Sequence, residues 1–392
     1  MKEKIKSFGI AKQSDPTAYV PITQADLIPV FSPDDGEDAI TAEDDTLTGS
    51  MWSAPAQFLG TKGRAGASFR IRGPGPGAVP ASDALPIGRV LQAAAFTEIR
   101  LATPETGVAG ANTNPAAIVL GAGASAVNDF YKGMAIQHAG IGAGTRGYSV
   151  IKSYYGATKT AILAETLAAP VNAGNYTIPA QLAYVQNTGA DIPVLSCAVG
   201  HDKVTHKYRS CAINNFAINV PVANENNTEL PSIEFSMFGA AMPKEDVAAL
   251  VLPDSMLTAV PPARGGKFVF NGQKLGHQSM RIDLGLEAGA LPNQNYDAGQ
   301  EAYQTLSGNR TVNWDLNKTL VSQLDLDALS NGRQKVSTLS VWGLGSGNTW
   351  ALAAFDNVLT PFNTAGRNGF LGVTGEGQPT QFDRAISLVL IF

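Results

Sequence analysis

The chain has 392 residues, and its 16% charged content lies well below the roughly 25% of an ordinary soluble domain. With a net charge of −5 and no basic stripe it is a poor candidate for specific nucleic-acid binding, and no apolar run reaches the roughly 20 residues of a membrane span. Abundant glycine and proline (41 and 23 residues) with few charges favour a mainly β chain. The lack of a long apolar run predicts no membrane insertion. The length allows about two or three domains, and much of the surface is expected to be covered by the chain itself or by further copies.

Residues 1 to about 50 are expected to form an irregular arm containing an acidic stretch, "SPDDGEDAITAEDDT". Its carboxylates do not have the alternation and glycine offset of a calcium loop, so no metal site is predicted. A solvated or partner-facing loop is the favoured interpretation. The acidic residues are Asp34, Asp35, Glu37, Asp38, Glu43, Asp44 and Asp45.

The next stretch, "APAQFLGTKGRAGASFRIRG", predicts one or two strands. It is followed by "DALPIGRVLQAAAF", which is typical of a short helix with Asp83 as the capping residue and Pro86 in the first turn.

From 104 to 187 the sequence consists of short apolar runs separated by Gly and Asn, which predicts a small β domain inserted into a larger one. Gly142, Gly144 and Gly147 spell G-x-G-x-x-G, the outline of a dinucleotide-binding turn. Such a turn must open a helix, whereas "YSVIKSYYGATKTAIL" favours strand, turn and strand. The acidic residue nearest the required offset, Glu165, lies in an alanine-rich run. We therefore predict a tight turn and no cofactor.

Most of the remaining sequence predicts strands at hairpin spacing. Alternation places Met280, Ile282, Leu284 and Leu286 on one face of a strand, and Val312, Trp314 and Leu316 on one face of another. One exception, "NKTLVSQLDLDALSNGR", predicts a helix with Leu320, Leu324 and Ala328 on one stripe and a stop at Asn331 and Gly332.

The residues that could carry chemistry form no recognised catalytic or metal-binding pattern. His201 and His206 lie five apart on a predicted hairpin, which is no metal spacing, and exposed hairpin histidines are expected. His138 and His277 are isolated. Cys197 and Cys211 flank the hairpin and could face each other, but two buried free thiols are favoured. The tryptophans within strand-like runs, Trp314, Trp342 and Trp350, are expected to pack in a core or interface rather than to stack on sugars. We predict no enzyme, no cofactor and no metal.

Several stretches, taken in order, support a resemblance. They are "AVNDFYKGMAIQHAGIGAGTRGYSVIKSYYGATKTAIL", then "DIPVLSCAVGHDKVTHKYRSCAINNFAINVPVANENNTELPSIEFSMFGA", then "LPDSMLTAVPPARGGKFVFNGQKL", "MRIDLGLEA" and "SGNRTVNWDLN". In the second, a turn at Gly200–Asp202 precedes a strand pair ending in "EFSMFG". The family pattern there is F-x-F-x-G, so the second aromatic is displaced to Phe238. From about residue 50 onward, the chain resembles the tail tube proteins of long-tailed bacteriophages, in the branch with an inserted β domain.

The resemblance implies a mainly β fold, a two-sheet β-sandwich or barrel with a flanking α-helix and an inserted small β domain. The core would comprise 1–103 and 188–392, with an N-terminal arm of about 1–50, and the inserted domain 104–187 would lie on the outer surface of a tube. Six copies would join edge to edge into rings, and the rings would stack into a conduit for DNA ejection.

The resemblance also implies partners and a location. The chain would assemble with itself and with the tape measure, terminator and baseplate proteins, and viral DNA would pass through the lumen without specific binding. It would be made in the bacterial host cytoplasm and reside in the virion tail. The acidic residues of 34–45 are candidate inter-subunit contacts, with Arg264 and Lys267 as basic partners. Two alternatives remain open: a tail-end or baseplate ring protein on the same fold, and a secreted β-sandwich carbohydrate-binding protein.

Overall fold

The computed structural model describes residues 7–42, 56–111, 113–138, 140–141, 144–167, 174–188, 192–223, 225, 227–295, 300–306, 308–317, 335–360, 363–367 and 370–392. The chain is mainly β: of the described residues, 54% lie in strands and 6% in helical segments, arranged as antiparallel sheets with one α-helix. The expected mainly β, sandwich or barrel-like fold class is confirmed.

The first half of the main sheet has the strand order β2-β3-β14-β13-β12-β1, with every pair antiparallel. The strands are β1 (Ser7–Lys12), β2 (Val30–Ala42), β3 (Gln57–Arg70), β12 (Leu195–Gly200), β13 (Thr205–Pro221) and β14 (Ser232–Ala241). The expectation that residues 1 to about 50 are irregular is therefore wrong, because β1 and most of the acidic stretch are strands.

The second half has the order β15-β21-β22-β25-β11-β4. Its strands are β4 (Phe96–Leu101), β11 (Gln181–Gln186), β15 (Lys267–Phe270), β21 (Val336–Gly343), β22 (Thr349–Leu359) and β25 (Ile386–Ile391). Three strands join the halves into one 17-stranded sheet: β17 (His277–Asp283) pairs with β13, β20 (Thr311–Asn317) pairs with β17, and β24 (Phe370–Pro379) pairs with β20 and β22.

Three short additions complete the main body. β16 (Gln273–Lys274) pairs with β15, β23 (Asn363–Arg367) pairs with β24, and β18 (Glu287–Pro292) forms a separate ribbon with β19 (Gln300–Leu306). Single 3-10 turns lie at η1 (Gln24–Asp26) and η3 (Asp254–Met256). The strand face predicted for Val312, Trp314 and Leu316 is confirmed, since all three are buried on β20. Met280 and Ile282 are buried on β17 as predicted, but β17 ends at Asp283, so Leu284 and Leu286 are buried in the segment that follows it.

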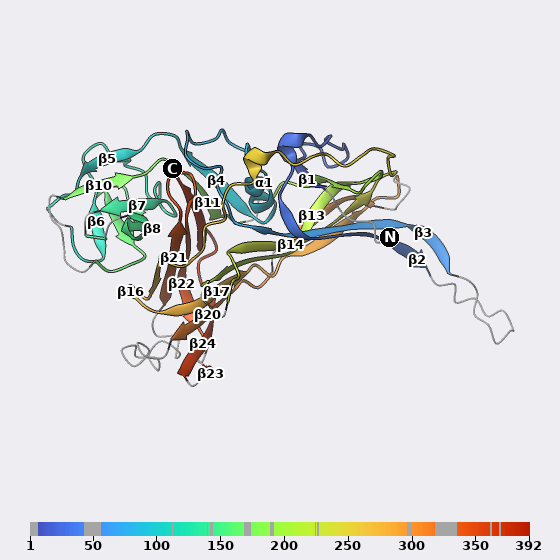
Figure 1. Ribbon diagram of the computed structural model, residues 1–392. Helices are drawn as coiled ribbons and strands as arrows, with labels where there is room; N and C mark the ends of the chain where they lie inside the picture. Colours follow the sequence, from blue (N-terminus) through green and yellow to red (C-terminus); the bar gives the residue numbers. More distant parts are fainter. Residues whose placement is uncertain are drawn as a thin grey trace.

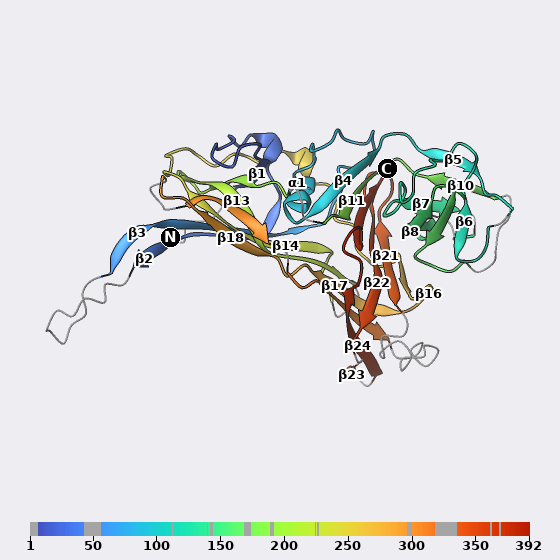
Figure 2. The ribbon, with the colours of Figure 1, turned by 180° about the vertical axis from the view of Figure 1, so that it is seen from behind.

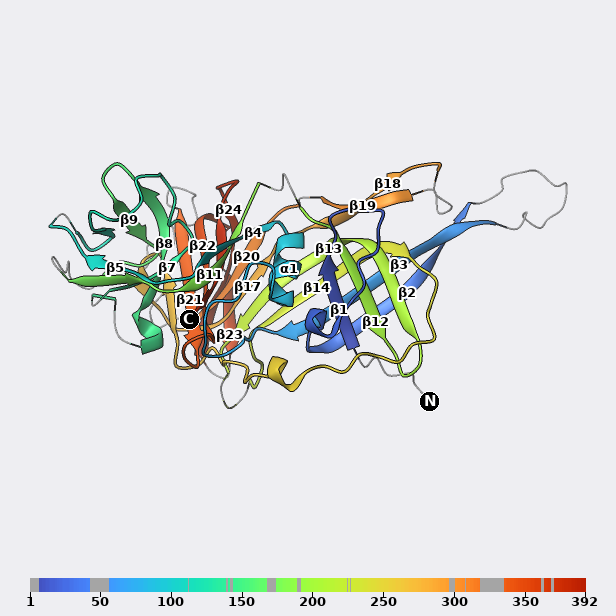
Figure 3. The ribbon, with the colours of Figure 1, turned by 90° about the horizontal axis from the view of Figure 1, so that it is seen from above.

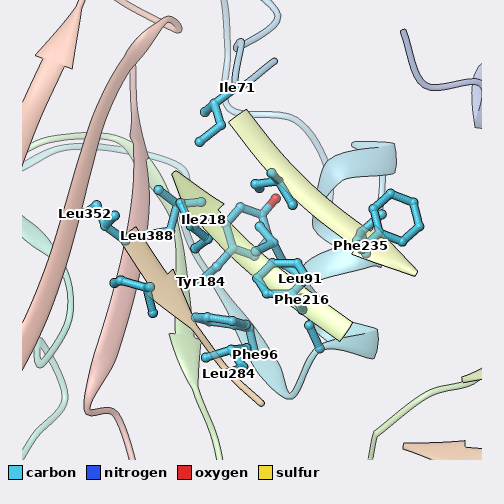
Figure 4. Packing of buried hydrophobic residues seen from close by; sticks show 14 of the residues in the cluster. Ile71, Leu91, Phe96, Tyr184, Phe216, Ile218, Phe235, Leu284, Leu352 and Leu388 are labelled. Carbon is cyan, nitrogen blue, oxygen red and sulfur yellow. The ribbon is translucent and has the colours of Figure 1, made fainter. Parts of the chain in front are cut away.

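The main core lies where the two halves face each other. Side chains from both halves converge there with residues of the helix, as Figure 4 shows for Leu91, Phe96, Tyr184, Phe216, Ile218, Phe235, Leu352 and Leu388. The helix α1 (Pro86–Ala93) contacts β1, β4 and β11, so it lies between the outer strands of the two halves and covers their open side. Its N-cap is Leu85 and not Asp83, a correction: the Asp83 carboxylate accepts a hydrogen bond from the Gln92 amide in the last turn.

Residues 105–178 contribute a separate six-stranded sheet, in the order β5-β10-β7-β8-β9-β6. Its strands are β5 (Glu105–Val108), β6 (Ala117–Val119), β7 (Ala135–His138), β8 (Tyr148–Tyr155), β9 (Thr160–Leu163) and β10 (Asn175–Ile178). The buried residues of this sheet form one continuous cluster with Val269, Val341 and Phe355 of the main sheet. The sheet is thus packed firmly onto the second half of the main sheet (Figure 1).

The molecule is elongated, with different structures at its two ends. The β2–β3 hairpin, which we call the arm (Val30–Ala42 and Gln57–Arg70), extends from one end, and the six-stranded sheet lies at the other (Figures 1 and 3). The reverse view shows β23 and β24 leaving the body in a third direction (Figure 2). In the part of the chain that the structure describes, no helix has the length and apolar character needed to cross a membrane. The helix predicted over 317–333 falls almost wholly outside the described residues.

Candidate functional site

The arm has features of an association surface. β2 and β3 pair in register from Val30 opposite Phe69 to Ala42 opposite Gln57, and among the described residues β2 pairs with β3 alone. The outer edge of a 13-residue strand is thus unpaired. Three large apolar side chains on the arm are exposed, Phe31 at 50%, Phe58 at 66% and Leu59 at 49%. A long strand edge beside exposed apolar groups is a template for pairing with another chain.

The described residues of the predicted acidic stretch lie along β2, and their side chains point to one or the other face of the strand. Asp34 is exposed and pairs with Arg64 across the hairpin at 3.4 Å, and Glu37 pairs with Lys244 at 3.5 Å. Asp38 is exposed. Glu43, Asp44 and Asp45 lie outside the described residues. Alternation along β2 places Asp34 and Asp38 on one face and Asp35 and Glu37 on the other, so Asp35 does not belong to the exposed acidic surface.

Asp35 instead forms a buried cluster with two histidines and a tyrosine. Its Oδ2 lies 2.6 Å from His206 Nδ1, 3.3 Å from His201 Nε2 and 3.4 Å from the Tyr208 hydroxyl, which donates to it. The Asp35 and His201 side chains are only 7% and 8% exposed, and that of His206 is 19% exposed. The two imidazole rings lie 4.6 Å apart. The expectation that these histidines are exposed is wrong.

Local structure explains how the cluster forms. His201 lies in the turn between β12 and β13, which its backbone N–H closes by donating to the Val204 carbonyl. His206 and Tyr208, two residues apart on β13, point to the same face. The Tyr208 ring contacts Gly63 of β3, where a Cβ would come within 2.3 Å of the ring, so only glycine admits the tyrosine there. The tyrosine thereby reaches Asp35 on the far side of β3.

Burial and the nearby Asp35 carboxylate raise the pKa of Tyr208, so its hydroxyl stays protonated and remains a donor. The two cysteines lie beside this cluster on β12 and β13. Both are buried free thiols, as predicted, and burial raises the pKa of each. These thiols are therefore poor nucleophiles.

The sequence does not reveal this cluster because its members are 166 and 171 residues apart. The only local signal is that His206 and Tyr208 lie two apart in a predicted strand, on one face, directly after the turn that holds His201. Two imidazoles and a carboxylate can accept protons or bind a divalent cation. In the part of the chain that the structure describes, no other three His, Cys, Asp or Glu residues converge in this way.

The two basic residues predicted as partners of the acidic stretch behave differently. Arg264 is exposed in a turn next to the six-stranded sheet, where Arg146 Nε donates to the Gly265 carbonyl at 3.1 Å. Lys267 is buried, a correction, and its ammonium is 2.5 Å from the Glu165 carboxylate with both side chains 2% exposed. Burial lowers the pKa of Lys267, while Glu165 opposes that shift. Lys267 therefore offers no charge to a neighbouring copy.

The glycine cluster and the tryptophans are structural. Gly144–Gly147 forms the 3-10 turn η2, and β8 begins at once where a dinucleotide site requires a helix. The predicted strand, turn and strand are confirmed by β8 and β9, while Gly142 lies outside the described residues. Trp314, Trp342 and Trp350 are buried, so their predicted packing role is confirmed.

Comparison with known proteins gives no family assignment. No model of a known protein family matches the chain, and no curated protein is significantly similar to it in sequence.

Proposed function

We propose that the chain is a structural protein that assembles into stacked hexameric rings, forming the tail tube through which a long-tailed bacteriophage ejects its DNA. The observation that carries this proposal is the arm, with its unpaired edge and exposed Phe58 and Leu59. The mainly β sandwich-like body with one helix over its open side agrees with the fold that the resemblance implies. In this proposal the role is non-catalytic, the partners are further copies and other tail proteins, and the location is the virion.

The polarity of the molecule favours a head-to-tail contact. The acidic surface of the arm lies at one end, and the turn carrying Arg264 lies beside the six-stranded sheet at the opposite end (Figures 1 and 3). The two charges are too far apart to meet within one chain, but they can meet between copies. Repeated contacts of one surface with a different surface close into rings or continue as filaments. We infer that Asp34 and Asp38 of one copy face the Arg264 turn of the next. Glu37 lies on the opposite face of β2, where it pairs with Lys244.

The carbohydrate-binding alternative receives no support from the tryptophans. A sugar platform needs an exposed aromatic face, and the three described tryptophans are fully enclosed. We therefore develop only the assembly proposal.

Electron microscopy of the concentrated full-length protein, combined with sedimentation velocity, tests the proposal. We expect rings or hollow tubes. The double variant Phe58→Ser, Leu59→Ser should raise the concentration needed for assembly at least about tenfold, because losing about 1.5–3 kcal/mol per buried apolar side chain exceeds the 1.4 kcal/mol of a tenfold change. The matched control is Val127→Ser, which changes an equally exposed residue of the six-stranded sheet (62%). It should assemble as the parent does.

Two results would contradict the proposal. A uniform monomer of the parent at high concentration would argue against self-assembly and would make a glycan-binding screen the next step. Normal tubes from the arm variant would leave self-assembly standing but would remove the arm from the interface.

A further inference from the structure

The buried cluster of Asp35, His201 and His206 has no part in the assembly proposal. We propose that these three side chains form a binding site for one zinc ion, which fastens β2 of the arm to the β12–β13 hairpin. The site belongs to the single chain, so the inference holds whether or not the protein forms rings.

The donor set is the one that zinc prefers in proteins. Zinc binds imidazole nitrogen and carboxylate oxygen at about 2.0–2.2 Å, commonly with three protein ligands and a water in the fourth position. His201 Nε2, His206 Nδ1 and Asp35 Oδ2 all lie within 4.8 Å of one another. Hard cations such as magnesium and calcium prefer sets made of oxygen alone, so two imidazoles favour zinc over either.

Two of the three separations between ligand atoms are close to those that zinc requires, and the two imidazole nitrogens lie within 4.8 Å of each other. Two ligands of a tetrahedral zinc ion lie about 3.3 Å apart when each is about 2.0–2.1 Å from the metal. His201 Nε2 and Asp35 Oδ2 are already 3.3 Å apart. His206 Nδ1 and Asp35 Oδ2 are 2.6 Å apart and must separate by less than 1 Å, which a rotation of the partly exposed His206 ring provides.

The contacts of Asp35 Oδ2 also favour a cation. Both imidazoles and the Tyr208 hydroxyl are directed at this one oxygen, although a carboxylate has two. With a zinc ion among the three atoms, each neutral imidazole presents a lone pair at the ligating nitrogen and carries its proton on the other one, Nδ1 of His201 and Nε2 of His206. Tyr208 then donates to the ligating carboxylate, which is the usual outer contact that orients a metal-bound carboxylate.

The surroundings of the His201 ring also favour a cation. It is 6% exposed, and its Nδ1 has no hydrogen-bond partner among the described residues. Its remaining polar contact is the long one from Nε2 to Asp35. Burying an imidazole on one such contact is unfavourable. A coordinate bond would replace the long contact of Nε2, with the ring proton then on Nδ1.

The experiment uses the full chain without an affinity tag, stripped with a chelator and dialysed. Zinc content after equilibration is measured by mass spectrometry of the metal, and affinity by competition with a chromogenic chelator. We expect one zinc per chain and a melting temperature that rises with zinc concentration, because the ion binds the folded chain. His206→Gln and Asp35→Asn should each weaken binding at least tenfold. Asp34→Asn is the matched control, since it removes the adjacent carboxylate from the exposed face of β2.

The result that overturns the inference is a folded parent protein that binds no zinc, or variants that bind it as tightly as the control. If the two variants fail to fold, X-ray absorption of the zinc-loaded parent decides the matter. Two imidazoles with oxygen in the metal shell support the site, and a shell of thiolates or of oxygen alone refutes it.

Discussion

Burial of His277 lowers its pKa and should make the stability of the protein depend on pH. The residue lies on β17 with its ring stacked on Phe268 at 3.9 Å, and its Nε2 is buried without a hydrogen-bond partner among the described residues. Burial lowers the pKa of His277 to about 4. An unfolded histidine has a pKa of about 6.5, so between these values the unfolded chain binds a proton that the folded chain refuses.

This difference predicts an acid-sensitive stability. As the pH falls from about 6.5 to about 4, His277 should remove up to about 3 kcal/mol from the free energy of unfolding. The measurement is urea unfolding of the parent and of His277→Gln at pH 7.5, 6, 5 and 4.5. The two stability curves should be parallel above pH 7 and should converge or cross in acid as the parent loses more. Parallel curves throughout would show that His277 does not carry the effect.

The ion pair between Glu165 and Lys267 connects two elements, the end of the six-stranded sheet and β15 of the main sheet. Both side chains are enclosed, so removing one partner leaves an unpaired buried charge. Lys267→Met and Glu165→Leu should each lower the free energy of unfolding by about 3–5 kcal/mol. The double variant should recover most of that loss, because two apolar side chains leave no charge uncompensated.

A double-mutant cycle in urea measures this coupling. The exposed pair of Arg281 and Glu234, 3.2 Å apart, provides the control, and Arg281→Met should cost less than about 1 kcal/mol. Additive losses in the buried pair would show that it does not hold the six-stranded sheet to the main sheet.

The elements differ in how well the sequence predicts them. The alternation from Met280 to Leu286 is visible because one face is apolar and the other polar. β2 is not visible, because "PDDGED" has poor strand propensity and becomes a strand only by pairing with β3. The clustering of Asp35 with His201, and of Glu165 with Lys267, depends on contacts between segments 102 to 171 residues apart. Local patterns carry no information about such contacts.

At the scale of the whole molecule, the two ends differ in structure, and this difference determines how copies could contact each other. The exposed face of the arm carries Asp34 and Asp38 beside Arg64 and Lys62 of β3. The Arg264 turn lies beside the six-stranded sheet at the opposite end. A contact between these ends has a direction, so an open chain of copies keeps one free surface at each of its two ends until a ring closes. Such a contact is partly electrostatic and partly apolar, and salt should weaken the first part only.

Charge reversal tests this arrangement directly. Arg264→Glu alone and Asp38→Lys alone should each raise the concentration needed for assembly, because each places like charges in contact. A mixture of the two single variants should assemble better than either one, because alternating copies pair Asp38 with Arg264 and the two introduced charges with each other. The double variant should also recover, since every interface then regains an opposite pair. Sedimentation velocity at 0.1 M salt measures the effect, and it should shrink at 1 M, where the screening length falls from about 10 to about 3 Å. Lys159→Glu, a reversal within the six-stranded sheet, should behave as the parent. If the double variant does not recover, Arg264 and Asp38 do not contact each other between copies. The exposed apolar residues of the arm would then account for any assembly observed.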